Sequence, residues 1–529
     1  MKRTGIPKFT AVIILLLAGT LLAWTPSKDI TLNPTSLIPL PVSVQYTGKD
    51  FTIDYNTSIF YPEKQPGLKD PAQFLARLLR PSTGYPVPVI ALKGKPSGKC
   101  IYLYLDISKK NKILGKEGYE LIVTKKKIYL TGNTPEGVFR GIQTLRQLMP
   151  AQVEKRLLQS GPWNIPTVKI TDYPTYAYRG AMLDVARHFF DVKTVEKYMD
   201  LMTLYKLNVL HLHLSDDQGW RIQIKSWPNL TKIGGSTEVG GGKGGYYTQK
   251  EFKELVRYAA KRYITIVPEI DMPGHIHAAL ASYDTLNCNN KKKKLFTGIQ
   301  VGFSTLCTHK PITYKFINDV VGEIAAISPG PWFHIGGDES HATPKKDYLP
   351  FIEKVQKIVA AHHKKVIGWD EIAQTPLQPG TMVQFWANKK NVQMAVKKGA
   401  KVILSPGGRC YLDMKYNKQT KLGLHWAGYV NVKKAYNWEP DTLIPGISKK
   451  DIAGIESPLW SETVTNLQDI EYMAFPRLIG HAEIGWTPDS LRNWNNYRMR
   501  LGAQALRLDM LYVNFYRSPL IPWIDSNFR

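Results

Sequence analysis

Eight short runs of β-branched or apolar residues recur along the second part of the chain, each followed by a polar loop and usually by a helical segment. The runs lie at residues 181–184, 209–214, 264–267, 332–335, 365–368, 382–385, 401–404 and 454–459. Regular alternation of strand and helix predicts parallel strands, and eight such units predict a closed (β/α)8 barrel, the TIM barrel. We therefore expect an α/β fold with this barrel over residues 173–529, although the last run contains Pro458, which is unusual inside a strand.

The residues before the barrel have a different pattern, in which strand-like and helical stretches alternate. Residues 101–105 and 127–131 are strand-like, and residues 134–149 carry apolar side chains at helical spacing. Thr134 is a suitable N-cap for this helix, and Glu136 follows it in the first turn. We predict a small α+β domain over residues 30–172, and we find no catalytic group of residues in it.

The N-terminus has the pattern of a secretion signal. Basic residues in the first eight positions precede an apolar run at residues 11–23. The run is shorter than the roughly 20 residues that a membrane-spanning helix needs. We predict a signal peptide at residues 1–23, cleaved near Ala23, and a secreted or periplasmic mature protein without a membrane span. An uncleaved anchor is the alternative.

Export would allow disulfide bonds, and the chain has four cysteines. Cys288 and Cys307 could close a local loop, whereas Cys100 and Cys410 lie far apart, and the spacing leaves the pairing open. No CxxC motif or Cys/His cluster indicates zinc. We expect neither a metal nor an organic cofactor.

The chain is strongly basic, because 70 Lys and Arg residues against 43 Asp and Glu residues give a formal net charge of +27. Such a charge is compatible with nucleic acid or with an anionic surface as a partner. The basic residues are spread along the chain, however, and the runs at 125–127 and 291–294 lie in no nucleic-acid-binding motif. We expect a solvated basic surface and no nucleic-acid partner, although the charge could attract the protein to an anionic cell envelope.

The barrel hypothesis places functional residues just after the strands, because active sites of such barrels lie at the C-terminal ends of the strands. Carboxylates and aromatic residues do follow the runs in this chain. Grouping carboxylates costs repulsion and desolvation, so this acidic mouth argues for function, although some of the acids could form structural ion pairs. Acids that exchange protons, together with aromatic faces that pack on sugar rings, predict a glycosidase.

Several motifs also resemble those of a known family. Residues 334–339, His-Ile-Gly-Gly-Asp-Glu, resemble the HxGGDE signature of family 20 glycoside hydrolases, the β-N-acetylhexosaminidases. Further similar motifs, in the same order as in that family, lie at residues 178–190, 211–220, 268–275, 411–416 and 458–462. The domain predicted before the barrel is similar to the one that precedes the barrel in this family, so the resemblance covers nearly the whole chain after the signal.

The resemblance implies substrate-assisted catalysis, in which the 2-acetamido oxygen of the sugar attacks its own anomeric carbon and forms an oxazolinium intermediate. In this scheme Glu339 is the general acid and then the general base. Asp338 holds the acetamido N–H and stabilises the positive charge, and Tyr411 donates its hydroxyl to the acetamido oxygen. Asp216 and His275 are similar to a polar pair of the family that supports the general acid.

The same motifs imply a pocket for one terminal sugar. Arg187 would bind the C3 and C4 hydroxyls, and Asp413 and Glu462 would accept from the C4 and C6 hydroxyls. The pocket would be walled by three tryptophans: Trp369, Trp386 and Trp460. We expect an exo-acting, retaining enzyme that releases terminal non-reducing β-GlcNAc, and also β-GalNAc, from oligosaccharides or glycoconjugates. Chitin fragments, host glycans and envelope polysaccharides are all candidate natural substrates.

The assigned roles make one geometric demand on the fourth strand of the barrel. Neighbouring residues of a regular strand point to opposite faces, so Asp338 and Glu339 can share a pocket only if the strand has ended before them. Gly336 and Gly337 allow the bend that this requires.

Two alternative functions fit parts of the sequence. His211 and His213 alternate along one run, like the metal ligands of barrel amidohydrolases, so a metal-dependent barrel hydrolase is the first alternative. We favour a buried, supporting role for both histidines. The second alternative is a non-catalytic barrel that binds carbohydrate or polyanions, which would not need the proton donor that Glu339 offers.

Overall fold

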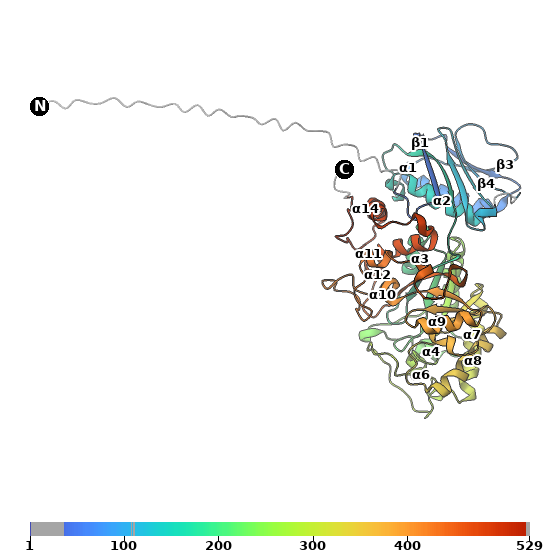
Figure 1. Ribbon diagram of the computed structural model, residues 1–529, viewed down its shortest axis with the longest axis vertical. Coiled ribbons are helices and arrows are strands. Elements are labelled where there is room, and N and C mark those ends of the chain that lie inside the picture. Colours follow the sequence, from blue (N-terminus) through green and yellow to red (C-terminus); the bar gives the residue numbers. More distant parts are fainter. Residues whose placement is uncertain (2–35, 107, 109–111, 525–529) are drawn as a thin grey trace. The chain divides into compact units, whose positions relative to one another are not determined.

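The computed structural model describes Met1 and residues 36–106, 108 and 112–524. The signal peptide predicted at residues 1–23 lies, apart from Met1, outside the described residues. The described chain forms a mixed sheet covered by two helices, followed by a closed eight-stranded barrel (Figure 1). The α/β fold with its (β/α)8 barrel, preceded by a small α+β unit, is therefore confirmed.

A seven-stranded sheet forms the first part of the fold, in the order β1-β7-β5-β6-β4-β2-β3. The strands are β1 (Ser43–Thr52), β2 (Ser58–Pro62), β3 (Val89–Leu92), β4 (Cys100–Leu105), β5 (Tyr119–Val123), β6 (Lys127–Gly132) and β7 (Asn164–Asp172). The strands β6, β4, β2 and β3 are mutually parallel, whereas β1, β7 and β5 pair antiparallel. Helix α1 (Lys69–Thr83) packs on β2 and β3, and α2 (Pro135–Leu148) packs on β4, β5, β6 and α1 (Figure 1).

Helix α2 corresponds to the helix predicted at residues 134–149. The side chain of Thr134 accepts a hydrogen bond from the backbone N–H of Gly137 at 3.2 Å, so it caps one of the free amides of the first turn, as predicted. From Glu136 to Leu148 every residue of α2 is buried. One reason is that α2 also faces the barrel, where Arg140 donates to the backbone oxygen of Tyr263 at 2.9 Å.

Eight parallel strands close the barrel, in the order β10-β11-β12-β13-β14-β15-β8-β9. They are β8 (Tyr178–Asp184), β9 (Val209–His213), β10 (Thr265–Glu269), β11 (Trp332–His334), β12 (Lys365–Trp369), β13 (Met382–Phe385), β14 (Lys401–Leu404) and β15 (Ile452–Leu459). Each of the eight predicted runs overlaps one of these strands. Pro458 is tolerated near the end of β15, where its carbonyl oxygen accepts a hydrogen bond from the backbone N–H of Leu412 at 2.7 Å.

Helices connect most of the barrel strands. They are α3 (Val192–Leu204), α4 (Asn229–Lys232), α5 (Gln249–Ala260), α6 (His277–Ser282), α7 (Pro311–Ile327), α8 (Lys345–Ala361), α9 (Lys389–Lys397), α10 (Gly407–Cys410) and α11 (Val432–Tyr436), with α12 (Leu467–Ala474), α13 (Arg477–Trp486) and α14 (Trp494–Met510) after the last strand. The connection from β12 to β13 departs from the regular alternation, because it holds only the short 3-10 helix η6 (Asp370–Gln374). Pro376 and Pro379 lie two and five residues after the end of η6 and prevent a longer helix there.

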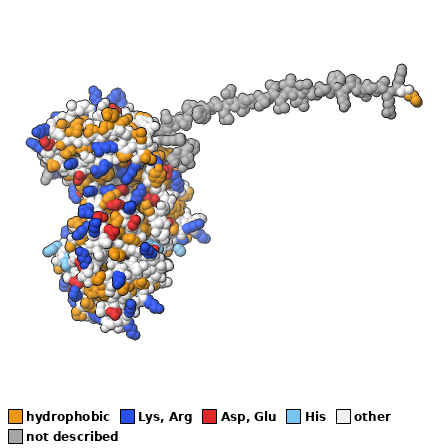
Figure 2. Space-filling model, turned by 180° about the vertical axis from the view of Figure 1, so that it is seen from behind, with side chains coloured by type: hydrophobic (Ala, Val, Ile, Leu, Met, Phe, Trp, Pro, Cys, Tyr) orange, Lys and Arg blue, Asp and Glu red, His pale blue; other side chains and the backbone are white. Residues whose placement is uncertain are grey.

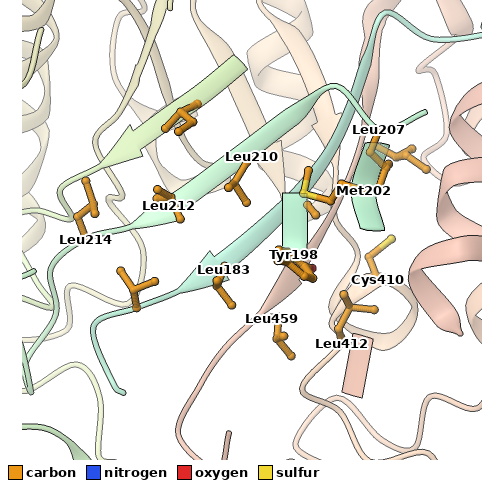
Figure 3. Packing of buried hydrophobic residues seen from close by; sticks show 14 of the residues in the cluster. Leu183, Tyr198, Met202, Leu207, Leu210, Leu212, Leu214, Cys410, Leu412 and Leu459 are labelled. Carbon is orange, nitrogen blue, oxygen red and sulfur yellow. The ribbon is translucent and has the colours of Figure 1, made fainter. Parts of the chain in front are cut away.

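Side chains of the barrel strands alternate between the surrounding helices and the barrel interior. On β9, Leu210 and Leu212 belong to the main hydrophobic core together with Met202 of α3 (Figure 3). Between and after them, His211 and His213 point into the barrel, where both contact carboxylates of other strands. Inward-facing polar residues on β9 are therefore available to support a site at the end of the barrel.

The structure selects one of the cysteine pairings that the sequence left open. Cys288 and Cys307 form a disulfide bond in the long connection between β10 and α7. Cys100 and Cys410 are buried free thiols.

The surface and the helices bear on the expected partners. Among the described residues, no helix combines the length and the apolar character needed to cross a membrane. On the face seen in Figure 2, Lys and Arg side chains are scattered rather than gathered into one patch.

Candidate active site

All the residues predicted for the site lie at the C-terminal ends of the barrel strands or in the segments that follow them. They follow or end β8 (Arg187), β9 (Asp216), β10 (His275), β11 (Asp338 and Glu339), β12 (Trp369), β13 (Trp386), β14 (Tyr411 and Asp413) and β15 (Trp460 and Glu462). The ends of β8, β9, β10 and β11 are level with one another, since Glu269 at the end of β10 pairs with both His213 and His334, and His213 pairs with Asp184. The closure of the barrel therefore brings the predicted residues to one mouth.

The chain bends sharply after β11, which ends at His334. Gly336 has a φ of 66° and Gly337 a φ of 98°, in the left-handed region that favours glycine. A Cβ atom on Gly336 would lie 1.7 Å from Oδ1 of Asp271, so no larger residue fits there. The bend that the sequence required between the strand and the acidic pair is present.

Because of this bend, Asp338 and Glu339 face the same histidine. Nε2 of His275 lies 3.9 Å from Oδ2 of Asp338 and 3.5 Å from Oε2 of Glu339. The backbone of Glu339 has a φ of 42°, which is unusual for a residue other than glycine. Strain of this kind is concentrated at functional sites.

The two neighbouring carboxyls have different surroundings. Asp338 is buried, and burial followed by the charge of Asp271 raises its pKa well above the ordinary value. Glu339 keeps 29% of its side chain exposed. Burial tends to raise the pKa of Glu339, but the hydrogen bond and charge of His275 outweigh burial and lower it. Without a sugar, Asp338 is therefore the carboxyl that holds a proton more tightly.

His275 connects Glu339 to a second carboxylate, Asp216. Nδ1 of His275 lies 3.4 Å from Oδ1 of Asp216, and Asp216 also contacts Nη2 of Arg187 at 2.8 Å and Nε2 of His213 at 2.9 Å. Burial disfavours the imidazolium of His275, but Asp216 outweighs burial and raises the pKa of His275 well above its ordinary value. In Asp216 the cations, Arg187 first, outweigh burial and lower the pKa. The predicted polar pair is thus an ionised carboxylate beside a charged histidine.

Aromatic residues form one wall of the mouth. Trp369, Tyr411 and Trp460 pack in one cluster, and the ring centre of Trp460 lies 5.9 Å from that of Trp369 and 6.3 Å from that of Tyr411. Trp386 packs against this cluster and is partly exposed. Burial, followed by the charge of Asp338, raises the pKa of Tyr411 well above its ordinary value, so its hydroxyl keeps its proton and can donate it in a hydrogen bond.

Several buried polar atoms of the mouth have no well-formed hydrogen bond with any described residue. These atoms are both carboxylate oxygens of Asp413, Oε2 of Glu462, Oδ1 of Asp338 and Nε of Arg187. Buried polar groups in proteins are nearly always hydrogen-bonded, so a cluster of exceptions at one mouth indicates a polar ligand. Hydroxyl groups of a sugar would donate to these oxygens, while the Arg187 guanidinium is held 4.7 Å from the ring centre of Trp460.

Behind the mouth, Glu269 is the centre of a buried polar cluster. It is hydrogen-bonded to Nδ1 of His213, and it lies 2.8 Å from Nδ1 of His334 and 3.0 Å from Nε2 of His211. Its other contact is with Trp369, whose Nε1 donates to Oε1 of Glu269 at 3.1 Å. One carboxylate therefore lies among three histidines and also holds one wall of the mouth.

The same cluster bears on the metal site considered for His211 and His213. The ring nitrogens of His211 face two carboxylates, with Nδ1 2.9 Å from Oε1 of Glu456 and Nε2 close to Glu269. Burial opposes a charge on His211, but Glu456 and Glu269 outweigh burial and raise its pKa to about 9. A metal ligand has to be a neutral imidazole with a free lone pair. The arrangement therefore favours the supporting role of the two histidines.

Two further residues of the mouth were not among the predicted ones. Trp426 is 55% exposed, and its ring centre lies 5.9 Å from that of Trp386 and 5.5 Å from that of Tyr411. It lies in the long segment between β14 and β15, where no sequence motif marks it. Glu371 accepts a hydrogen bond from Nε1 of Trp386 at 3.1 Å. In the sequence, only the position of Glu371 shortly after a predicted strand indicated that it could lie at the mouth.

A cavity of about 360 Å³ opens beside Glu339 and Trp386. Its lining also includes the polar side chains of Glu371, Gln374 and Lys345. The exposed edge of Glu339 therefore faces a space large enough for a further small molecule or sugar ring.

Two family models match the chain. The one described as "Glycosyl hydrolase family 20, catalytic domain" matches residues 176–489, and "Glycosyl hydrolase family 20, domain 2" matches residues 34–173. The chain is 39% identical over 493 residues to the β-N-acetylhexosaminidase of Cellulomonas fimi, which covers 92% of this chain and 97% of that protein. It is 35% identical to a β-hexosaminidase of Porphyromonas gingivalis, over 93% of this chain and 65% of that protein.

Solved structures give the same picture. The chain is 46% identical to the GH20 β-N-acetylhexosaminidase of Streptomyces coelicolor A3(2), with a TM-score of 0.89 over 93% of this chain and 99% of that one. A mutant β-hexosaminidase of Streptomyces plicatus, in complex with the product GlcNAc, is 48% identical, with a TM-score of 0.89 over 93% of this chain and 98% of that one. These similarities extend over nearly the whole chain.

Proposed function

The chain belongs to glycosyl hydrolase family 20, and on this premise we propose that it is an exo-acting, retaining β-N-acetylhexosaminidase that releases terminal β-GlcNAc and β-GalNAc. Hydrolysis in this family is assisted by the substrate itself. The observation that carries the proposal is the shared orientation of Asp338 and Glu339 toward one mouth, in which buried acceptors form no well-formed hydrogen bond with the described residues.

The first step forms the intermediate. Glu339 gives its proton to the glycosidic oxygen, the bond from that oxygen to the anomeric carbon breaks, and the acetamido oxygen bonds to the same carbon. Oδ1 of Asp338 accepts from the acetamido N–H and stabilises the positive charge that develops there, which is most effective where water is excluded. Tyr411 donates to the acetamido oxygen. The attacking group is part of the bound sugar, so no entropy is spent on bringing in a nucleophile.

The second step returns the enzyme to its starting state. Water attacks the anomeric carbon and gives a proton to the Glu339 carboxylate, and the bond to the acetamido oxygen opens. Because the anomeric carbon is inverted twice, the product keeps the β configuration.

A bound sugar changes the two carboxyls in opposite directions. It covers the exposed part of Glu339, and stronger desolvation raises the pKa of that carboxyl. The acetamido N–H supplies a donor to Asp338, which favours its charged form. The order found without a sugar is then reversed, so that Glu339 can act as the acid and Asp338 as the carboxylate.

Recognition of the sugar uses the unpartnered atoms of the mouth. Asp413, Glu462 and Arg187 bind the hydroxyls of the non-reducing end, and the acetamide methyl lies against Trp369 and Trp460. Since these contacts use the hydroxyls that a further sugar would occupy, the enzyme acts from the chain end. The leaving group occupies the side of Glu339, where the cavity opens.

The proposal is tested with two aryl β-glycosides that differ only in the 2-acetamido group. Wild type should hydrolyse the GlcNAc compound much faster than the glucoside, and Glu339→Gln and Asp338→Asn should each lower turnover by about two to four orders of magnitude. A thiazoline mimic of the bicyclic intermediate should inhibit wild type. Similar rates on both glycosides, or a sugar ester trapped on either carboxylate, would contradict substrate assistance. Salt-sensitive binding without turnover, equal in wild type and Glu339→Gln, would support the non-catalytic alternative.

We further propose that the protein is exported to the periplasm or the medium, with its signal at residues 1–23, and that its basic surface attracts it to anionic envelope polymers. The basic start and the apolar run support the first part, and the net charge of +27 supports the second. Cell fractionation with N-terminal sequencing tests export, and an intact cytosolic chain would contradict it. Release of the protein from envelope preparations by salt tests the attraction.

The natural substrate is tested separately, by comparing the hydrolysis rates of chitin fragments, host glycans and envelope polysaccharides.

A further inference from the structure

Acidic and histidine side chains alternate from the barrel interior to the edge of the mouth. Oε2 of Glu269 is hydrogen-bonded to Nδ1 of His213, and Nε2 of His213 lies 2.9 Å from Oδ2 of Asp216. Oδ1 of Asp216 lies 3.4 Å from Nδ1 of His275, and Nε2 of His275 lies 3.5 Å from Oε2 of Glu339. The five residues form one continuous polar chain that ends on the proposed general acid.

The charge of His213 follows from its contacts. Both of its ring nitrogens face carboxylates, which accept but do not donate when ionised, so both nitrogens have to carry a proton. The side chains of Glu269, His213 and Asp216 are fully buried, and solvent therefore does not screen these contacts. Burial disfavours the imidazolium, but Glu269 outweighs burial and raises the pKa of His213 well above its ordinary value.

We propose that Glu269 is a positioning residue for the reaction. Glu269 keeps His213 charged, and His213 together with Arg187 holds Oδ2 of Asp216, so that Oδ1 of Asp216 faces His275. This arrangement sets the pH range over which Glu339 carries its proton. The inference rests on the proposed role of Glu339 as the general acid. It gives a function to two residues, Glu269 and His213, that touch neither the reacting atoms nor the solvent.

Other charged or titratable groups face this polar chain from the elements packed against it. They are Asp184 and Arg187 at and after β8, His211 on β9 and Asp217 after it, Asp271 after β10, His334 on β11 with Asp338 and His341 after it, and Glu456 on β15 with Glu462 after it. All of them are unchanged in Glu269→Gln and His213→Gln, so that these two variants differ from wild type only in the polar chain itself.

Neutralising Glu269 should move the proton equilibrium of Glu339 in a defined direction. In Glu269→Gln, His213 no longer keeps its second proton. The protein therefore loses the negative charge of Glu269 and also the positive charge of His213. Because His213 lies closer to Asp216 than Glu269 does, the loss of the positive charge dominates, and the surroundings of Asp216 become more negative. His275 and Glu339 then keep their protons to higher pH.

The measured quantity is the alkaline limb of the pH profile of kcat, which reports the loss of the acid form of Glu339. This limb should move up by about half a pH unit in Glu269→Gln. His213→Gln removes the cation but leaves Glu269 ionised, so its limb should move up farther. An unchanged limb in both folded variants, or a move to lower pH, would overturn the inference.

A second readout separates positioning from general damage to the fold. An aryl β-GlcNAc with a poor leaving group needs protonation, whereas a dinitrophenyl glycoside hardly does. A rise of about half a unit in the pKa of Glu339 makes it a weaker acid, so Glu269→Gln should lower kcat about two- to threefold on the first substrate and leave it nearly unchanged on the second. Equal losses on both substrates would mean that Glu269 is only structural.

Glu456→Gln is the matched control. Glu456 is as buried as Glu269, but it contacts His211 rather than His213. Its replacement should leave the alkaline limb where it is in wild type, and circular dichroism and thermal unfolding show whether each variant is folded. A limb shift in Glu456→Gln as large as in Glu269→Gln would refute the specific route through His213.

Glu339→Gln, measured in the same series, shows whether a negative result contradicts the role of Glu269 alone or the proposed function of the protein as well. If it loses activity mainly on the poor leaving group while Glu269→Gln and His213→Gln keep the wild-type profile, the inference on Glu269 fails and the proposed function stands. If Glu339→Gln retains full activity, the proposed function itself fails.

Discussion

Replacing Asp413 with asparagine should make the sugar-free protein more stable and the enzyme less active. Both carboxylate oxygens of Asp413 are buried, and no described residue gives either one a well-formed hydrogen bond. Asparagine has the same shape without the charge. The carboxylate therefore destabilises the free protein. In the proposed mechanism, a hydrogen bond from a sugar hydroxyl offsets this destabilisation when the substrate binds.

The stability effect has a defined pH dependence. Burial, followed by the charge of Glu462, raises the pKa of Asp413 well above the ordinary value of 3.8. The folded state then binds a proton that the unfolded state has lost, so stability falls as the pH rises above the unfolded value. Asp413→Asn should consequently gain little near pH 4 and most at neutral pH. A buried charged group without a partner costs more than a neutral one, and we take the difference between the carboxylate and the amide to be about 1–3 kcal/mol. For a chain of 529 residues this corresponds to about 1–3 °C in Tm.

The expected loss of activity follows from the hydrogen bonds to the sugar. A hydrogen bond to a charged group contributes about 1.5–3 kcal/mol. Losing one such bond at Asp413 in the transition state should lower kcat/KM about ten- to hundredfold.

Thermal unfolding at pH 4 and pH 7, and initial rates on an aryl β-GlcNAc, measure the two effects. Glu154→Gln is the control, because Glu154 is equally buried but is paired with Arg146 at 2.6 Å and also with Arg507. It should lower Tm and leave kcat/KM unchanged. If Asp413→Asn instead lowers Tm at neutral pH together with activity, the carboxylate is structural and the argument is wrong.

Three further predictions concern other parts of the molecule. Tyr411→Phe removes the proposed donor to the acetamido oxygen and should lower kcat on an aryl β-GlcNAc about a hundredfold, with KM less affected; an unchanged kcat would exclude that donor. Treatment with a chelator should leave activity intact, whereas a loss that zinc restores would support the metal-dependent alternative built on His211. The pKa of Glu117 is lowered to about 2, since Arg179 and Arg140 outweigh burial. The stability that this pairing provides is complete above the ordinary value of 4.5 and is lost as the pH falls toward 2. The drop in urea midpoint from pH 7 to pH 3 should accordingly be smaller in Glu117→Gln than in wild type.

Much of the fold could be predicted because its signals are local. The eight strand runs show in the residue pattern itself, and Thr134 marks the start of α2 by a hydrogen bond from Gly137 in the first turn. The positions of the predicted site residues followed from one global rule, that parallel strands of a barrel end on the same side. The bend at Gly336 and Gly337 could be inferred because two neighbouring carboxylates cannot otherwise share a mouth.

Other features depend on contacts between distant segments and had no local signal. Trp426 reaches the mouth from a long segment without a motif, and the disulfide bond between Cys288 and Cys307 was one of several pairings. The missing helix between β12 and β13 was masked by the otherwise regular alternation.

The amino-acid sequence by itself determined where the barrel strands lie and which kinds of side chain follow them, because both are properties of short stretches of chain. The tertiary structure decided what each carboxylate does. Glu269 lies among three histidines, whereas Asp413 is buried without a well-formed side-chain hydrogen bond to any described residue. The two acids look alike in sequence, and they differ because the pKa of a buried carboxyl is set by atoms that other strands bring within a few ångströms of it.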